Sequence, residues 1–184
     1  MSKILAVAKT IINPKEKASA EFWISHIIII VSTVLGVYLA AGAGFDVAVE
    51  FEKTRMDREL YYMESALLSE IRDNTEYASS YSTGYLKGEI NFKQGANNEL
   101  DTFIWTTMTN TGHSFQIEAE LLTQVRRFYS NVSKNLRLLS EGRNAFAAKE
   151  IKRLSEEASL KLIPEMEKNI LKKYASLKER NIID

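Results

Sequence analysis

The two histidines, His26 and His113, are the side chains best suited to metal or proton chemistry, and they lie far apart in the sequence. A di-iron bundle needs Glu-x-x-His pairs on facing helices, but the residue three before His113 is Asn110. The chain has no cysteine, which excludes a disulfide framework and a cysteine-ligated zinc or iron–sulfur centre. It also lacks a P-loop, a GxGxxG motif and a GxSxG motif. We therefore expect no catalytic residue, no metal and no cofactor, and a protein that is not an enzyme.

Carboxylates are the other groups whose pairing would suggest acid–base chemistry, and four stand near predicted helix cores: Glu64, Glu70, Glu118 and Glu120. Each of them flanks a predicted core position instead of occupying one. This placement predicts solvated side chains on the outer faces of helices. His113 follows Gly112 in a connection between helices, where we expect a surface or capping residue.

Composition and charge narrow the class of protein. The chain has 184 residues, of which 45% are hydrophobic and 26% charged, as in one ordered domain of modest size. The 24 Lys and Arg balance 24 Asp and Glu, so the net charge is zero. A balanced chain lacks the basic field that drives non-specific binding to nucleic acid, and we expect no nucleic-acid partner.

The most informative element is the run 22–45, FWISHIIIIVSTVLGVYLAAGAGF, which contains no Lys, Arg, Asp or Glu. As a helix it would be about 36 Å long, enough to cross a hydrocarbon core of about 30 Å. A buried helix of a soluble protein rarely stays uncharged for so long. A cleavable signal peptide is the second alternative, and the small residues at 40–44 resemble a cleavage region, but the run starts late and is long. We favour an intact signal anchor.

Two features of this span point to its surroundings. Small residues recur every four positions and so share one helical stripe; they are Ser32, Gly36, Ala40 and Gly44. Such a stripe lets a second helix approach closely in lipid, so it predicts packing against another membrane subunit or a second copy of the chain. At the other end, Trp23 and His26 lie one turn apart and are predicted to anchor the helix at the membrane interface.

Flanking charges indicate the orientation of the span. Lys3, Lys9, Lys15 and Lys17 precede it, whereas three carboxylates follow it before the first cation, Lys53. The positive-inside rule then predicts a cytoplasmic N-terminus and a periplasmic or extracellular C-terminal domain. The reverse orientation stays open. Residues 1–21 include a short amphipathic piece ending at Asn13-Pro14, which predicts either a helix lying on the bilayer or a frayed tail.

Residues 46–184 carry the periodicity of a helical domain. Apolar residues at helical spacing predict that the span continues as one amphipathic helix to near Ser80, followed by the main loop at 82–98. A short helix is expected from Asn98, as N-cap, to Thr111-Gly112. Pro164 is expected to kink or break the last helix, with a restart at Pro164-Glu165.

The clearest helix carries apolar residues spaced by three or four, as in packing of helix on helix: Ile117, Leu121, Val125, Phe128, Val132, Leu136 and Leu139. Glu141-Gly142 is its predicted end. The chain is therefore predicted to be all-α. A single N-terminal transmembrane helix continues into a long helix of an antiparallel bundle with three long helices and one short helix.

Aromatic and apolar residues near the main loop form a candidate partner or ligand site. Its members are Tyr81, Tyr85, Ile90, Phe92 and Trp105. The alternative is that these side chains pack the core and the end of the bundle.

These features favour a membrane-anchored accessory or interaction subunit of a membrane protein complex. Its expected partners are the lipid bilayer and either other membrane subunits or a second copy. The alternative is an extracytoplasmic sensory or ligand-binding module that signals through a partner, since only about 21 residues would face the cytoplasm and that length is too short for a signalling domain.

Overall fold

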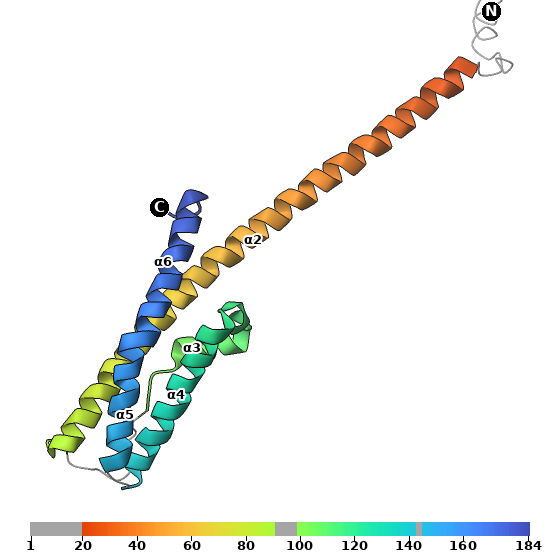
Figure 1. Cartoon of the computed structure of the whole chain (residues 1–184). Helices are drawn as coiled ribbons and strands as arrows, with labels where there is room; N and C mark the ends of the chain where they lie inside the picture. The colour runs from red at the N-terminus through yellow and green to blue at the C-terminus, as the bar shows by residue number, and fades with distance from the viewer. Residues whose placement is uncertain (1–19, 91–98, 143–144) are drawn as a thin grey trace, which may run out of the picture. The chain divides into compact units, whose positions relative to one another are not determined.

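A computed structural model describes residues 20–90, 99–142 and 145–184, and all regular secondary structure in them is helical. The elements are α2 (Ala20–Lys87), α3 (Phe103–Thr111), the 3-10 turn η1 (His113–Gln116), α4 (Ala119–Ser140), α5 (Ala145–Glu157), the π turn η2 (Ala158–Leu162) and α6 (Ile163–Glu179) (Figure 1). The predicted all-α fold is confirmed. Most of the predicted N-terminal segment 1–21 lies outside the described residues.

The chain consists of two compact units, Met1–Glu52 and Lys53–Asp184, and α2 contributes residues to both. In the first unit every side chain from Glu21 onward is exposed, including the isoleucines at 27–30. Within the described residues, α2 is the one helix long and apolar enough to cross a membrane. The predicted membrane-length helix is thereby confirmed.

The carboxyl end of α2 lies further along the chain than the sequence predicted. The helix ends at Lys87 instead of near Ser80, so the loop predicted at 82–98 is wrong for its first residues, while 91–98 lie outside the described residues. Gly88 has a φ of 73° and donates to the carbonyl of Tyr85 at 3.1 Å, and the Glu89 amide donates to that of Gly84 at 2.9 Å. This is a Schellman end, which needs a glycine at the left-handed position.

The helices of the second unit form a bundle, and the directions of α2 and α6 follow from three ion pairs between α2 and the residues from α6 to its C-cap, Arg180. Arg180 pairs with Asp57, Lys173 with Glu64, and Arg72 with Glu167. Residue numbers rise along α2 as they fall along α6, so the two helices are antiparallel. The Gln124 side chain of α4 donates to Glu165 at 2.9 Å, and Asn169 donates to Glu118, the N-cap of α4, at 3.5 Å, so α6 is antiparallel to α4 as well.

The core follows the predicted seam of α4. Its apolar residues from Ile117 to Leu139 are at most 5% exposed, and they pack with Leu67 and Ile71 of α2 and with Ile151 and Met166 of the last helices. The α4 helix ends at Glu141-Gly142, as predicted, and Gly142 has a φ of 82°. Burial of this continuous stripe is the main force that holds the helices together.

Two other predicted helix boundaries are wrong. Helix α3 begins at Phe103, not just after Asn98, and Asn98 itself lies outside the described residues. The Phe103 amide donates to Asp101 Oδ1 at 3.0 Å. Its predicted end is confirmed, since Gly112 has a φ of 78°.

Of the kink or break predicted at Pro164, the break with a restart at Pro164-Glu165 is wrong, because the π turn η2 precedes the proline and the chain stays helical from Ala145 to Glu179. The kink stays a prediction. The Ile163 amide reaches back five residues to the carbonyl of Ala158. Proline lacks an amide and its ring collides with the carbonyl four residues earlier in a regular helix. The wider turn removes that collision, and Pro164 then lies in the first turn of α6, where its missing amide costs little.

Candidate functional site

The small-residue stripe of the span is open along its length. Ser32, Gly36, Ala40 and Gly44 all lie on α2 and are exposed, and a Cβ atom added at Gly36 or Gly44 would meet no heavy atom within 4 Å. Nothing in the described chain therefore fills the space that the missing side chains leave. Packing of a second membrane helix against this stripe stays a prediction.

Trp23 and His26 lie in the first turns of the same helix. Their common neighbour is Phe22, whose ring is 6.3 Å from that of Trp23 and 4.0 Å from that of His26. His26 Nδ1 lies 2.8 Å from the carbonyl oxygen of Phe22, so the imidazole is bonded to its own helix in the tautomer that has the proton on Nδ1. This arrangement suits the predicted interfacial role, since Nδ1 is bonded within the helix and Nε2 is the nitrogen that water or a lipid headgroup can reach.

The candidate residues near the main loop are divided among three places. Tyr81 stacks on Tyr77 along α2 at 6.0 Å. Trp105 of α3 stacks on Tyr129 of α4 at 5.6 Å. Tyr81, Tyr85 and Trp105 are partly buried and pack against the core, as in the alternative interpretation. Their role as a partner or ligand site stays a prediction.

Ile90 folds back over α2, where a Cβ added at Gly84 would lie 2.7 Å from its Cδ1 atom. A side chain at position 84 would therefore displace the side chain of Ile90. Phe92, the remaining member of the candidate site, lies outside the described residues.

Two of the four carboxylates predicted to be solvated are buried instead. Glu64 is 3% exposed and Glu70 is 6% exposed, whereas Glu118 and Glu120 are exposed as predicted. The periodicity contained the signal, since Glu64 stands four residues after Leu60 and three before Leu67, on the buried face of α2. The sequence-based prediction assigned only the apolar residues to that buried face and placed its acids in solvent.

Glu70 binds the amino end of α3. Its two carboxylate oxygens accept hydrogen bonds from the amides of Ile104 at 2.5 Å and Trp105 at 3.1 Å. Next to it, Asn74 accepts the Asp101 amide at 2.8 Å and donates to the Asp101 carbonyl at 2.6 Å. A carboxylate at a helix N-terminus satisfies donors that have no partner within the helix and interacts favourably with its dipole.

The Tyr129 hydroxyl also donates to Glu70 Oε1, which places three donors around one carboxylate. Burial, followed by the hydrogen bond to Glu70, raises the pKa of Tyr129 well above its ordinary value. The hydroxyl thus keeps its proton and serves as a donor. The arrangement of Glu70, Asn74 and Tyr129 fixes α3 on α2 and α4.

Glu64 is held by one cation, Lys173 of α6, whose side chain is 32% exposed. His113, the other titratable candidate, is half-buried at the start of η1, and its Nδ1 is covered without a hydrogen-bond partner among the described residues. No group of three or more His, Asp or Glu side chains in the described ranges is placed to hold a metal ion.

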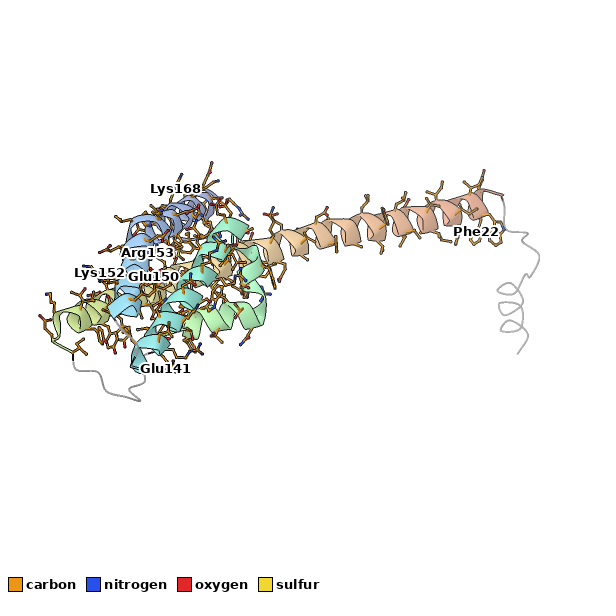
Figure 2. All side chains as sticks on the ribbon, turned by 60° about the horizontal axis from the view of Figure 1, so that its bottom comes forward. Phe22, Glu141, Glu150, Lys152, Arg153 and Lys168 are labelled. Carbon is orange, nitrogen blue, oxygen red and sulfur yellow. The ribbon has the colours of Figure 1, made fainter. Side chains whose placement is uncertain are left out.

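A groove of about 830 Å³ lies between α4 and the continuous helix formed by α5, η2 and α6. Its floor is apolar, from Phe128, Leu154, Ala158 and Leu162, and its rim is charged. On the α5 side Arg153 donates to Glu150 at 2.7 Å and to Glu157 at 2.8 Å; Figure 2 shows Glu150 and Arg153 on that helix. No motif in the sequence predicted this groove, because it depends on how two distant helices pack.

Comparisons with known proteins identify no relative: no protein-family model, curated protein or solved structure matches the chain.

Proposed function

We propose that the protein is a single-pass, membrane-anchored accessory or interaction subunit of a membrane protein complex. Its span binds a second membrane helix along the small-residue stripe, and its helical bundle binds a partner outside the lipid. The N-terminus lies in the cytoplasm and the bundle lies in the periplasm or outside the cell.

The observation that carries this proposal is the bare apolar surface of α2. Between Phe22 and Phe51, its large apolar side chains are 50–74% exposed in the isolated chain. Soluble monomers rarely expose a contiguous apolar surface of this length, and water would make it prone to aggregation. Lipid and a neighbouring helix are the environments that suit it.

A second observation supports a binding role over a chemical one. Two buried acids of the bundle, Glu70 and Glu64, are used to hold helices together. Such contacts give a rigid, well-defined surface, which is what an interaction subunit requires.

The experiment is purification of the tagged, full-length protein from membranes in a mild detergent. We expect the protein to sediment with the membrane fraction before detergent is added. After solubilisation it should co-purify with a membrane partner, or with a second copy, in a fixed ratio. A Gly36→Leu and Gly44→Leu double variant should stay in the membrane and lose that partner, because leucine side chains keep the two backbones apart.

The matched control is Gly42→Leu, which makes the same kind of change on the opposite side of the same helix. A Cβ added at Gly42 also meets no heavy atom within 4 Å in the chain itself. Contacts within the chain therefore give no reason for the stripe variant and the control variant to differ in partner binding. Recovery of the protein in the aqueous fraction without detergent would refute the anchor. Equal effects of the stripe and control variants would refute the stripe as the contact.

A further inference from the structure

The outer side of α4 is cationic and carries no acid. From Leu121 to Ser140 the sequence contains no Asp or Glu, and it contains four cations: Arg126, Arg127, Lys134 and Arg137. All four are exposed. Helical spacing places Arg126, Lys134 and Arg137 on the side opposite the buried seam, while Arg127 lies at the edge of that side and borders the groove. We refer to these four residues as the α4 cation face.

The charges of the α4 cation face are not neutralised by the described part of the chain. None of the four cations forms an ion pair there. The neighbouring helix α5 shows the opposite pattern, since Arg153 pairs with both Glu150 and Glu157. On α4, Lys134 and Arg137 stand three residues apart, and like charges at that spacing repel each other and destabilise a helix. An anion bound between them would remove this repulsion.

The residues around the cations favour a protein over a lipid bilayer as the source of the anion. Helices that lie on a bilayer combine cations with apolar side chains that enter the acyl region. The outer side of α4 has none of these, because the exposed large apolar residues of the described chain include none between Phe115 and Phe146. The exposed positions among the cations are polar instead: Ser130, Asn131 and Ser133.

The type of cation favours carboxylates. Three of the four are arginines, and a planar guanidinium binds a carboxylate through two parallel hydrogen bonds. From Arg126 to Arg137 the helix rises by about 16 Å. An extended segment of about five residues covers that length, so one short acidic stretch can reach the whole face.

We propose that the α4 cation face binds a carboxylate-rich segment of a partner protein, and this inference rests on the proposed function as an interaction subunit. The carboxylates of that segment bind Arg126, Lys134 and Arg137, and the hydroxyl of Ser130 donates a hydrogen bond among them. Charge complementarity selects this occupant, because the four cations have no acid of their own in the described chain. The contact determines which partner binds, and it weakens as salt rises.

The test uses the full-length protein in nanodiscs of phosphatidylcholine, so that the lipid adds no net charge. The probe is a fluorescent peptide of about twelve residues in which glutamate alternates with serine, long enough to cover the face when extended. Fluorescence anisotropy at low salt should show saturable binding. An Arg126→Glu and Lys134→Glu double variant should weaken it by at least about tenfold, since attraction becomes repulsion at two positions.

The matched control is Lys168→Glu with Lys172→Glu, which changes the net charge equally at exposed positions of α6 (Figure 2 labels Lys168). Its affinity should stay within about twofold of the parent protein. A second pair, Arg126→Gln with Lys134→Gln, removes the charges without adding acids and should weaken binding by about threefold or more. It keeps the test decisive if the acidic pair disturbs folding, which thermal unfolding would reveal.

A cross-linking experiment identifies the source of the anion in intact membranes. A photoreactive phenylalanine analogue in place of Ser130 should cross-link to another protein, at a segment rich in Asp and Glu. The Arg126→Glu and Lys134→Glu changes should abolish that cross-link. Cross-links to lipid alone, or to a second copy of the chain alone, would overturn the proposal.

Three results with the peptide would also overturn it. They are the absence of saturable binding, an equal loss in the α6 control, which would show a response to net charge alone, and tighter binding of a single-stranded oligonucleotide of the same charge. The Gly36→Leu and Gly44→Leu double variant should bind the peptide as the parent protein does. Failure at the α4 cation face is therefore distinguishable from failure of the proposed membrane contact.

Discussion

The carboxylate of Glu70 on α2 and the hydroxyl of Tyr129 on α4 meet inside the bundle, and the hydroxyl donates to the carboxylate. Two amides at the start of α3 donate to the same acid. One side chain thus joins three helices, and its removal would leave several buried donors without an acceptor.

We expect Glu70→Ala to destabilise the protein by about 2–4 kcal/mol, because each buried donor that loses its partner costs about 1–3 kcal/mol. Chemical denaturation of the full-length protein in detergent, followed by circular dichroism, measures the change. Glu76→Ala is the control, since Glu76 is an exposed acid on the same helix and its loss should change stability by less than about 0.5 kcal/mol. Equal effects of the two variants would contradict the role of Glu70.

The raised pKa of Tyr129 predicts a loss of stability at alkaline pH. The unfolded chain releases this proton near the ordinary pKa of 10.0, whereas the folded state holds it to higher pH because of burial and the bond to Glu70. Above about pH 10 the unfolded state therefore binds fewer protons, and the free energy of unfolding falls as pH rises.

Tyr129→Phe should remove part of that alkaline fall, which denaturation curves between pH 8 and pH 11 would measure, since tyrosine ionises near pH 10. Tyr77 and Tyr81 also have raised pKa values from burial, so part of the effect should persist. Tyr62→Phe is the comparison, because Tyr62 is 57% exposed. The explanation fails if both variants lose stability with pH as steeply as the parent.

The buried carboxylate of Glu64 predicts unequal consequences for two ion pairs of α2. Lys173→Ala leaves Glu64 buried without its cation and should cost about 2–4 kcal/mol. Arg72→Ala removes a pair whose side chains are 49% and 42% exposed, and should cost at most about 1 kcal/mol. A Glu64→Leu and Lys173→Met double variant should recover most of the stability lost in Lys173→Ala. Thermal unfolding of the two single variants and the double variant would show whether burial of the ion pair determines how much stability its loss costs.

The orientation of the chain in the membrane can be determined by labelling single introduced cysteines, because the sequence contains no cysteine. Ser130→Cys on the exposed side of α4 should react with a membrane-impermeant maleimide while the cytoplasmic membrane is intact. Ser2→Cys should react only after lysis. The reverse pattern of labelling would place the bundle in the cytoplasm.

Local signals in the sequence were enough to predict much of the fold. The uncharged run 22–45 predicted a helix of membrane length, and the apolar spacing from Ile117 to Leu139 predicted a buried seam. Both patterns lie within one helix, and both predictions are confirmed. Gly112 and Gly142 were also predicted correctly as helix ends, since a glycine in the left-handed region is a local requirement.

The errors arose where distant residues decide the outcome. The burial of Glu70 depends on the amides of Ile104 and Trp105, which no spacing near position 70 reveals. Beyond Ser80, helix α2 buries Ser82 and packs Tyr81 and Tyr85 against the core, whereas a glycine in a polar stretch read alone indicates a loop.

The π turn at Ala158–Leu162 also limits how the length of this segment can change. It accommodates one more residue than a regular helical turn of the same rise. Deleting one residue there would restore a regular helix and keep the flanking residues on the same face, so Met166 and Leu177, both 2% exposed, would stay in the interior. The regular turn would, however, bring the ring of Pro164 against the carbonyl four residues earlier. A deletion in this stretch should therefore be tolerated only together with replacement of Pro164.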